Sequence, residues 1–268
     1  MNNNMTQEQR LDYLITSFLG ENDEYSNIEV PKGAEGKRRV LRSLMNVRMP
    51  SQMDNDVLEV QDSYLKERIL SNGIVQLADI PMVKGNISIW QGDITRLAVD
   101  AIVNAANSQM LGCFLPMHTC IDNCIHTFAG VQLRRECHEK MNQLRKIYGS
   151  NYEQPTAVPM LTDAYNLPAK KVIHVVGPIV QNSLNASLEG QLAECYGNTL
   201  DLCRDNSLKS VAFCCISTGV FHFPNKRAAE IAVDTVEKWL SVNDYPMERV
   251  IFNVFKNEDK KYYEELFA

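Results

Sequence analysis

Residues 99–107 read VDAIVNAAN, a short apolar run with strand character that carries asparagines toward its end. A similar run, ISIWQ at 87–91, precedes it, and the turn sequence GDIT lies between them. Strand-like and helix-like segments then alternate to the C-terminus: helix at 121–146, strand at 170–178, helix at 187–206, strand at 210–217, helix at 225–242, strand at 249–255 and helix at 259–267. This alternation predicts an α/β fold with an open, largely parallel sheet that helices cover on both faces.

The residues before this region have helical rather than strand character. Thr6 and Gln9 have the spacing of a capping box, and apolar residues follow with helical period until Gly20. Further helices are expected to end before Pro50 and at Gly73. We therefore divide the chain into a helical N-terminal extension, 1–84, and an α/β domain, 85–268. The extension carries no recognisable chemical motif.

Composition excludes several classes of protein. The 268 residues carry a net charge of −6, which gives no electrostatic footprint for nucleic acid. The N-terminus lacks the pattern of a secretory signal, and no apolar run approaches the roughly 18 residues that a membrane span needs. We expect a cytoplasmic protein without nucleic-acid or membrane partners. In that compartment the eight cysteines are core residues, metal ligands or reactive thiols rather than disulfides.

Polar residues stand where the predicted strands end, and ligands of open α/β sheets bind beyond the carboxyl ends of the strands. Asp93 follows the first strand, where it either accepts a hydrogen bond from a ligand amine or simply caps a turn. Asn104 and Asn107 end the second strand, and asparagine needs a turn or a partner there. The segment CISTGVFHFP, 215–224, offers small residues whose backbone amides can approach a pyrophosphate, although ordinary strand-helix connections use the same residues.

The segment LGCFLPMHTCIDNCIH, 111–126, contains Cys113, His118 and Cys120 in a loop with Pro116. Two thiolates and an imidazole suit zinc, and catalytic zinc sites use three protein ligands and leave the fourth position to water or substrate. A structural site would need a fourth ligand, for which Cys124 and His126 are the candidates. Both would lie inside a helix that begins at Ile121. The alternative is a loop with two buried thiols and a surface histidine.

Asp122 follows two residues after Cys120, at the expected start of this helix. The ordinary interpretation is a helix N-cap. Its closeness to the three ligand-type residues suggests a second role, in which the carboxylate orients a water molecule or a sugar.

Together these motifs resemble a known family. GDIT, VDAIVNAAN, NLPAKKVIHVVGP and CISTGVFHFP, in this order and spacing, are similar to the signature of the macrodomain, an α/β/α module that binds ADP-ribose. The resemblance covers about residue 85 to the C-terminus and implies a three-layer α/β/α fold with a mixed, largely parallel sheet. Metal-free hydrolases of the family have a glycine-rich loop like GGGVDGAIH where this chain has GCFLPMHTCIDNCIH. That variant, with a helical extension, resembles the zinc-dependent macrodomains of bacteria found in operons with a sirtuin-type ADP-ribosyltransferase and lipoate-attachment machinery.

The resemblance implies a zinc-dependent hydrolase that removes mono-ADP-ribose from modified protein side chains, as a glycosidase or by cleaving an ester. Its partners would be ADP-ribose and an ADP-ribosylated protein, with a lipoyl-carrier protein and a sirtuin-type ADP-ribosyltransferase as further candidates. Two other functions stay open: a reader that binds ADP-ribose without cleaving it, and a deacetylase of O-acetyl-ADP-ribose.

The family's functional residues match the following positions of this sequence. The carboxylate of Asp93 would accept the adenine amine, with Ile94 beside it, and Phe255 would pack on adenine unless it is a core residue. The diphosphate loop would comprise Ser217, Thr218, Gly219, Val220 and Phe221. Asn107 would contact the distal ribose, with Asp122 as the second catalytic residue. Cys113, His118 and Cys120 would bind Zn²⁺, with an open coordination position that faces the ribose.

Overall fold

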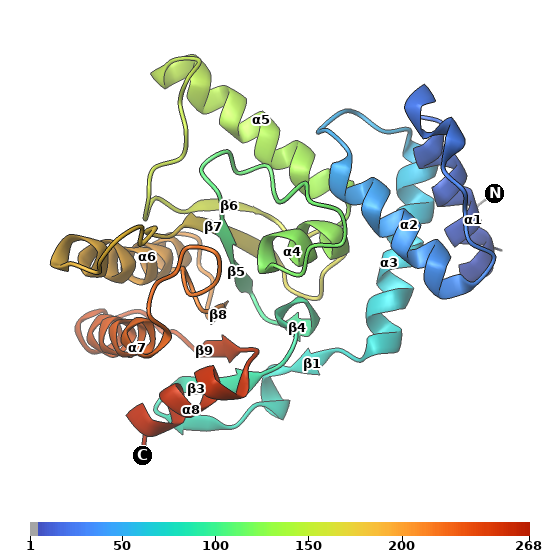
Figure 1. The fold of residues 1–268 in the computed structure, drawn as a ribbon. Helices are drawn as coiled ribbons and strands as arrows, with labels where there is room; N and C mark the ends of the chain where they lie inside the picture. Colours follow the sequence, from blue (N-terminus) through green and yellow to red (C-terminus); the bar gives the residue numbers. More distant parts are fainter. Residues whose placement is uncertain (1–4) are drawn as a thin grey trace.

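A seven-stranded mixed sheet lies at the centre of the molecule (Figure 1), for which a computed structural model describes residues 5–268. In spatial order its strands are β2 (Met82–Lys84), β3 (Ile87–Gln91), β9 (Arg249–Val254), β8 (Ser210–Phe213), β5 (Ala101–Ala106), β7 (Lys171–Val176) and β6 (Met160–Asp163). The five inner strands run parallel, and the two edge strands pair antiparallel. The predicted α/β fold with a mixed, largely parallel sheet is confirmed.

Helices cover both faces of this sheet, as the nearly continuous apolar composition of the inner strands requires. They are α4 (Ile121–Ala129), α5 (Val131–Tyr148), α6 (Ala186–Asp205), α7 (Asn225–Val242) and α8 (Asn257–Leu266). Helices α6 and α7 pack against each other on one side of the sheet, and α4 lies against β5 on the other (Figure 1). The polar residues that follow the parallel strands therefore meet at one edge of a rigid three-layer core.

The segment predicted as one helix, 121–146, forms two helices. The break lies at Gly130, whose φ of +98° is a conformation that L side chains rarely adopt. A Cβ atom there would lie only 2.7 to 2.9 Å from side-chain atoms of Gln132, Gln61 and Asn166. A one-residue interruption leaves the helical period of the sequence almost unchanged, so periodicity does not reveal it.

Four short strands of the described residues are also absent from the prediction. Edge strand β6 has only four residues, too few for its alternating burial to stand out in the sequence. Strand β1 (Val75–Gln76) pairs with β4 (Leu97–Ala98) outside the main sheet. Strand β2 adds to the main sheet from Met82, before the boundary that we placed at 85. The described residues also form three 3₁₀ helices, which are η2 (Asp23–Asn27), η3 (Leu77–Asp79) and η4 (Ile94–Arg96).

The N-terminal extension is a bundle of α1 (Gln7–Leu19), α2 (Ala34–Val47) and α3 (Asn55–Asn72) beside α4 (Figure 1). The predicted capping box is confirmed, because the Thr6 hydroxyl accepts from the Gln9 amide and the Gln9 side chain accepts from the Thr6 amide. The bundle has an apolar core of its own, which Val131 of α5 joins. Within residues 5–268, no helix is both long and apolar enough to cross a membrane.

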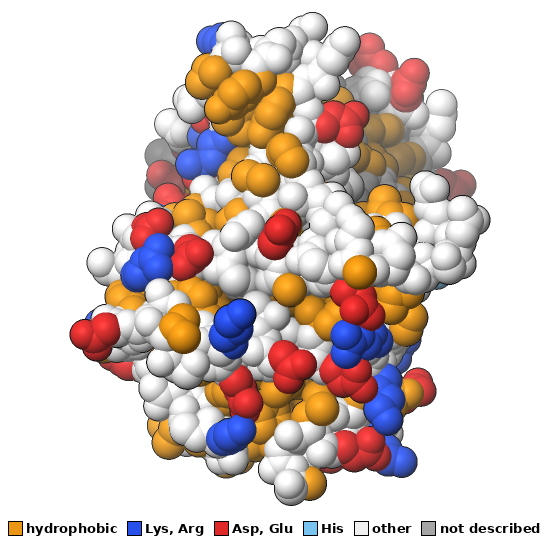
Figure 2. Space-filling view, turned by 90° about the vertical axis from the view of Figure 1, so that its left-hand side faces the viewer, with side chains coloured by type: hydrophobic (Ala, Val, Ile, Leu, Met, Phe, Trp, Pro, Cys, Tyr) orange, Lys and Arg blue, Asp and Glu red, His pale blue; other side chains and the backbone are white. Residues whose placement is uncertain are grey.

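The face seen from the left of Figure 1 carries acidic and basic side chains that are interspersed (Figure 2). Ion pairs at short range occur among the described residues, for example Arg227 with Glu189 at 2.7 Å and Lys171 with Asp163 at 2.5 Å. A face of this kind presents no extended field of one sign.

Candidate active site and metal centre

The loop from Asn107 to Cys120 connects the carboxyl end of β5 to α4 and contains all three predicted metal ligands. Three of its residues, Met110, Gly112 and Met117, have φ between 59° and 78°. Two of these are not glycine, so neighbouring groups must hold the loop in this conformation.

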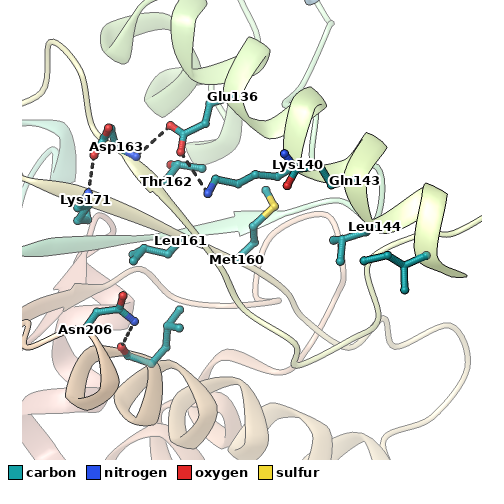
Figure 3. Close-up of a pocket in the computed structure, with 12 residues that line it drawn as sticks. Glu136, Lys140, Gln143, Leu144, Met160, Leu161, Thr162, Asp163, Lys171 and Asn206 are labelled. Atoms are coloured by element: carbon teal, nitrogen blue, oxygen red, sulfur yellow. Dashed lines mark hydrogen bonds and ion pairs between the residues drawn. The ribbon is translucent and has the colours of Figure 1, made fainter.

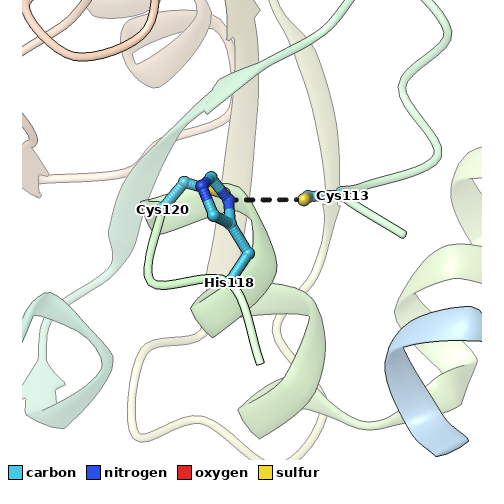
Figure 4. Close-up of side chains that lie close together, drawn as sticks. All are labelled: Cys113, His118 and Cys120. Carbon is cyan, nitrogen blue, oxygen red and sulfur yellow. Dashed lines mark hydrogen bonds between the residues drawn. The ribbon is translucent and has the colours of Figure 1, made fainter. Parts of the chain in front are cut away.

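The loop brings the ligand atoms of Cys113, His118 and Cys120 within 4.8 Å of one another (Figure 4). The Cys113 Sγ lies 3.5 Å from the His118 Nδ1, and all three residues are partly exposed. Two sulfur atoms and one imidazole nitrogen are a donor set that zinc prefers. Among residues 5–268, no fourth histidine, cysteine or carboxylate joins this cluster. The residues therefore fit a zinc ion with an open coordination position.

Cys120 also ends the loop as the N-cap of α4. Its sulfur accepts a hydrogen bond from the Asn123 amide at 3.4 Å, and the helix begins at Ile121 as predicted. Burial raises the pKa of the Cys120 thiol to about 12. This sulfur is therefore a thiol in the metal-free protein, and binding of a cation would displace its proton.

The two alternative ligands lie elsewhere. Cys124 Sγ is 3.6 Å from the Arg42 guanidinium. The buried His126 ring packs beneath Gly112, where a Cβ would come within 2.8 Å of it. Neither residue belongs to the cluster of three.

A second group of ligand-type residues, His126, Cys137 and His174, is wholly buried. His174 hydrogen-bonds with the Asn104 amide through Nδ1 at 3.0 Å and with the Thr162 hydroxyl through Nε2 at 3.0 Å. Because both nitrogens of His174 are engaged, we assign this group to the hydrogen-bonded core beneath the site. Burial lowers the pKa of His174 to about 3 and that of His126 well below its ordinary value.

The buried His174 predicts a loss of stability in mild acid. Its folded pKa lies below the unfolded one, so the unfolded chain binds the extra proton and stability falls once the pH drops below the unfolded pKa of about 6.5. The stability advantage of the native protein over His174→Gln should shrink by about 2 kcal/mol between about pH 7 and pH 5. Denaturant unfolding of both proteins at the two pH values measures this difference, and a constant difference would contradict the prediction.

Asp122 lies in the first turn of α4 and is only 5% exposed. The ordinary N-cap interpretation is wrong for this residue, since Cys120 occupies that position. Asn104 donates to Asp122 Oδ1 at 2.8 Å, and Asn107 lies 3.4 Å from Oδ2. Burial raises the pKa of the Asp122 carboxyl to about 6. The three side chains form one hydrogen-bonded unit at the end of β5, beside the ligand loop, in which Asn104 and Asp122 are buried and Asn107 is partly buried.

Asp93 and Phe255 follow β3 and β9, which are neighbours in the sheet. Asp93 is the N-cap of η4, as its simpler interpretation predicts, and its Oδ1 accepts from the Thr95 amide and hydroxyl. Ile94 is 1% exposed, so only its backbone is available to a ligand. The Phe255 side chain is 77% exposed, which excludes the interpretation as a core residue.

The loop 217–221 follows β8 and opens with Ser217 at a φ of +64°. Its ends are held by backbone hydrogen bonds from Phe223 to Ser217 and from Val180 to Phe221. The Ser217 hydroxyl is packed against Gly177, where any Cβ would lie 2.1 Å from the Ser217 oxygen. Thr218 donates to the Cys215 carbonyl, whereas Gly219 and Val220 are exposed.

The order of the strands in the sheet places the predicted site residues in one line. Strands β3, β9, β8 and β5 are consecutive in the sheet and parallel, so Asp93, Phe255, the loop 217–221 and Asn107 follow one another along the same edge. The metal-ligand loop stands at the Asn107 end of this line. Such an edge accommodates an elongated ligand, with its last portion next to the ligand cluster.

Comparisons with known proteins identify the family of this chain. The Macro domain family matches residues 103–232. The protein-ADP-ribose hydrolase of Treponema medium is 47% identical, over 98% of this chain and all of its own length. That of Staphylococcus aureus strain MRSA252 is 43% identical, over 96% of this chain and 95% of its own. The chain belongs to the macrodomain family.

The fold of this macrodomain is likewise similar to solved members of the family. The Trypanosoma brucei macrodomain in complex with ADP-ribose superimposes with a TM-score of 0.65 at 27% identity, covering 85% of this chain and 95% of its own. The family match begins within β5, whereas the two bacterial relatives align over nearly the whole chain, extension included.

A separate pocket of about 480 Å³ lies between α5, α6 and the edge strand β6 (Figure 3). Its lining includes Lys171, the first residue of β7, so the pocket lies at the amino end of that strand. None of its lining residues is a predicted site residue. The pocket is therefore distinct from the edge of the sheet at which the predicted site residues lie.

Proposed function

We propose that this macrodomain hydrolyses the bond between mono-ADP-ribose and a modified protein side chain, and that Cys113, His118 and Cys120 bind a zinc ion for this reaction. The observation that carries the proposal is the three-ligand cluster at the Asn107 end of the line of site residues. The names of the two bacterial relatives, protein-ADP-ribose hydrolase, support the reaction. The complex of the Trypanosoma brucei macrodomain supports ADP-ribose as the bound group.

The nucleotide half of the substrate would lie along the strand ends. The Asp93 carboxylate is fixed by its bonds to Thr95 and would accept the exocyclic amine of adenine. The exposed Phe255 ring offers a face on which adenine can stack. Backbone amides of 217–221 would donate to the diphosphate. These contacts bind and orient the substrate without taking part in bond cleavage.

The distal ribose would lie against Asn107. The amide oxygen of this residue accepts from the Gln109 amide at 3.1 Å and keeps a second lone pair for a ribose hydroxyl. The amide nitrogen is held by the Gly112 carbonyl and the Asp122 carboxylate. When bound at the three ligands, zinc would supply Lewis-acid chemistry for cleavage of the bond between the ribose and the protein side chain. Asn107 and Asp122 supply the positioning.

The decisive experiment combines metal analysis with turnover. Purified protein should contain about one zinc ion per chain and should release ADP-ribose from a mono-ADP-ribosylated protein, and a chelator should abolish release. Tight binding without release from any ADP-ribosylated protein would instead identify a reader. A faster reaction on O-acetyl-ADP-ribose than on protein-linked ADP-ribose would identify a deacetylase. A lipoyl-carrier protein and a sirtuin-type ADP-ribosyltransferase are further candidate partners.

Asp93→Ala tests the adenine contact separately. Because a hydrogen bond to a charged group contributes about 1.5 to 3 kcal/mol, the affinity for free ADP-ribose should fall about 10-fold or more. Asp234→Ala removes an exposed carboxylate of α7 and is the matched control. Isothermal titration with ADP-ribose gives both dissociation constants, and equal values would exclude Asp93 from the adenine site.

A further inference from the structure

The N-terminal extension touches the metal-ligand loop directly, through helix α2, which packs against α4 (Figure 1). We propose that Arg42 and Asn46 of α2 are positioning residues for the metal site: they hold the loop in the conformation that brings Cys113, His118 and Cys120 together. This inference rests on the proposed function, since it assigns a role toward the zinc ion of that site.

Arg42 bonds to a ligand residue itself. Its Nη2 donates to the backbone carbonyl of His118 at 2.8 Å and to the Asn123 side-chain oxygen at 2.9 Å. The first bond crosses 76 residues of sequence and fixes the backbone from which the imidazole projects. The second bond orients the Asn123 amide, and a bond to a charged donor is roughly twice as strong as a neutral one.

Asn123 connects Arg42 to the other two ligand residues, Cys113 and Cys120. Its side-chain nitrogen donates to the carbonyls of Cys113 at 3.3 Å and Leu115 at 3.0 Å. Its backbone amide donates to the Cys120 sulfur. Arg42 and Asn123 together therefore contact the backbone or the sulfur of all three ligand residues.

Asn46 holds the strained residue next to His118. Its side-chain oxygen accepts from the Met117 amide at 3.0 Å, and its nitrogen donates to the Thr127 hydroxyl at 2.8 Å. Met117 has a φ of +59°, which is unfavourable for a residue with a side chain. The 1% exposed Asn46 thus ties this turn to α4 from the side of α2.

These contacts matter for metal binding because the loop has no regular structure of its own. If the loop became ordered only when zinc binds, its loss of conformational entropy would weaken zinc binding. Outer residues that orient metal ligands change metal affinity by about 10- to 100-fold when they are replaced. The extension would then raise the affinity of the site for zinc, in addition to packing against α4.

The test compares Arg42→Ala, Arg42→Lys and Asn46→Ala with Arg39→Ala, an exposed residue of the same helix. Zinc affinity is measured by competition with a chromophoric chelator, and the thiolate-to-cobalt absorption of the Co²⁺-loaded protein reports the ligand geometry. We expect about 10-fold weaker zinc binding and a lower cobalt absorption for Arg42→Ala and Asn46→Ala. Arg42→Lys should recover part of the affinity, and Arg39→Ala should behave like the native protein. ADP-ribose affinity should stay within about 2-fold in all four.

A readout without metal separates this inference from the proposed function. In zinc-free protein, a thiol reagent should modify Cys113 and Cys120 faster in Arg42→Ala than in the native protein, because the loop is released. Native zinc affinity and native thiol reactivity in variants that unfold at the native temperature would overturn the inference. Failure of the native protein to bind zinc or to release ADP-ribose would instead overturn the proposed function, while the thiol reactivity would still report on loop positioning.

Discussion

Replacing Cys113, His118 or Cys120 with alanine is expected to lower the rate of release of ADP-ribose from a modified protein by at least about 100-fold. Each side chain supplies one of only three ligand atoms in the cluster. Loss of one leaves two ligands, too few to retain a catalytic zinc ion. The affinity for free ADP-ribose should change little, since the predicted adenine and diphosphate contacts lie on β3, β9 and β8 rather than in this loop.

The measurement pairs turnover with zinc content and ADP-ribose titration for each variant. Cys124→Ala is the matched control, because this thiol lies four residues from Cys120, is partly buried and does not belong to the cluster. It should keep its zinc and most of its activity. Native turnover in folded, zinc-free variants of the ligand residues would remove the metal from the mechanism.

The parts of this molecule that the sequence predicts are those set by short-range pattern. Apolar strands such as 99–106 alternate with amphipathic helices, and this alternation is sufficient for the layered fold and its largely parallel sheet. The closeness of Cys113, His118 and Cys120 follows in the same way, because eight residues of irregular loop leave the three side chains little room to separate.

The hydrogen bonds that support the ligand loop cannot be predicted from short-range sequence pattern. Arg42 and Asn123 are 81 residues apart in the chain, and nothing in the local sequence around Arg42 marks it as a partner of the loop. Arg134 is equally unremarkable in sequence, yet it is buried and donates to the carbonyls of Leu111 and Met45 while its guanidinium lies 4.2 Å from the Phe114 ring centre. Tertiary packing decides these bonds, and a single sequence contains no signal for them.

The position of Asp122 illustrates the same limit at shorter range. An acidic residue next to a helix start predicts an N-cap, but the Cys120 sulfur accepts the capping bond and leaves the carboxylate to face Asn104. Asn104 in turn contacts both Asp122 and His174, and His174 lies beside Asn104 because β5 and β7 pair. What looks like a local cap is therefore part of a unit that spans two strands and a helix.

That unit leads to a second large effect. Asn107→Ala and Asp122→Ala are each expected to lower kcat by about 100-fold, about 2.7 kcal/mol of activation free energy, with a smaller change in KM. Asn107 would contact the ribose, and Asp122 holds the Asn107 amide nitrogen at 3.4 Å. Because the two act through one hydrogen-bonded unit, the double variant should be scarcely slower than either single variant.

Steady-state kinetics on a mono-ADP-ribosylated protein test this, with thermal unfolding to confirm that each variant folds. Asp122→Asn keeps the side-chain volume, so a loss that it shares with Asp122→Ala reports on the carboxylate rather than on a cavity beside Asn104. Gln109→Ala, an exposed side chain of the same loop, should retain native kcat. If the losses of the two single variants multiplied in the double variant, Asn107 and Asp122 would act independently and Asp122 would need a contact of its own with the substrate.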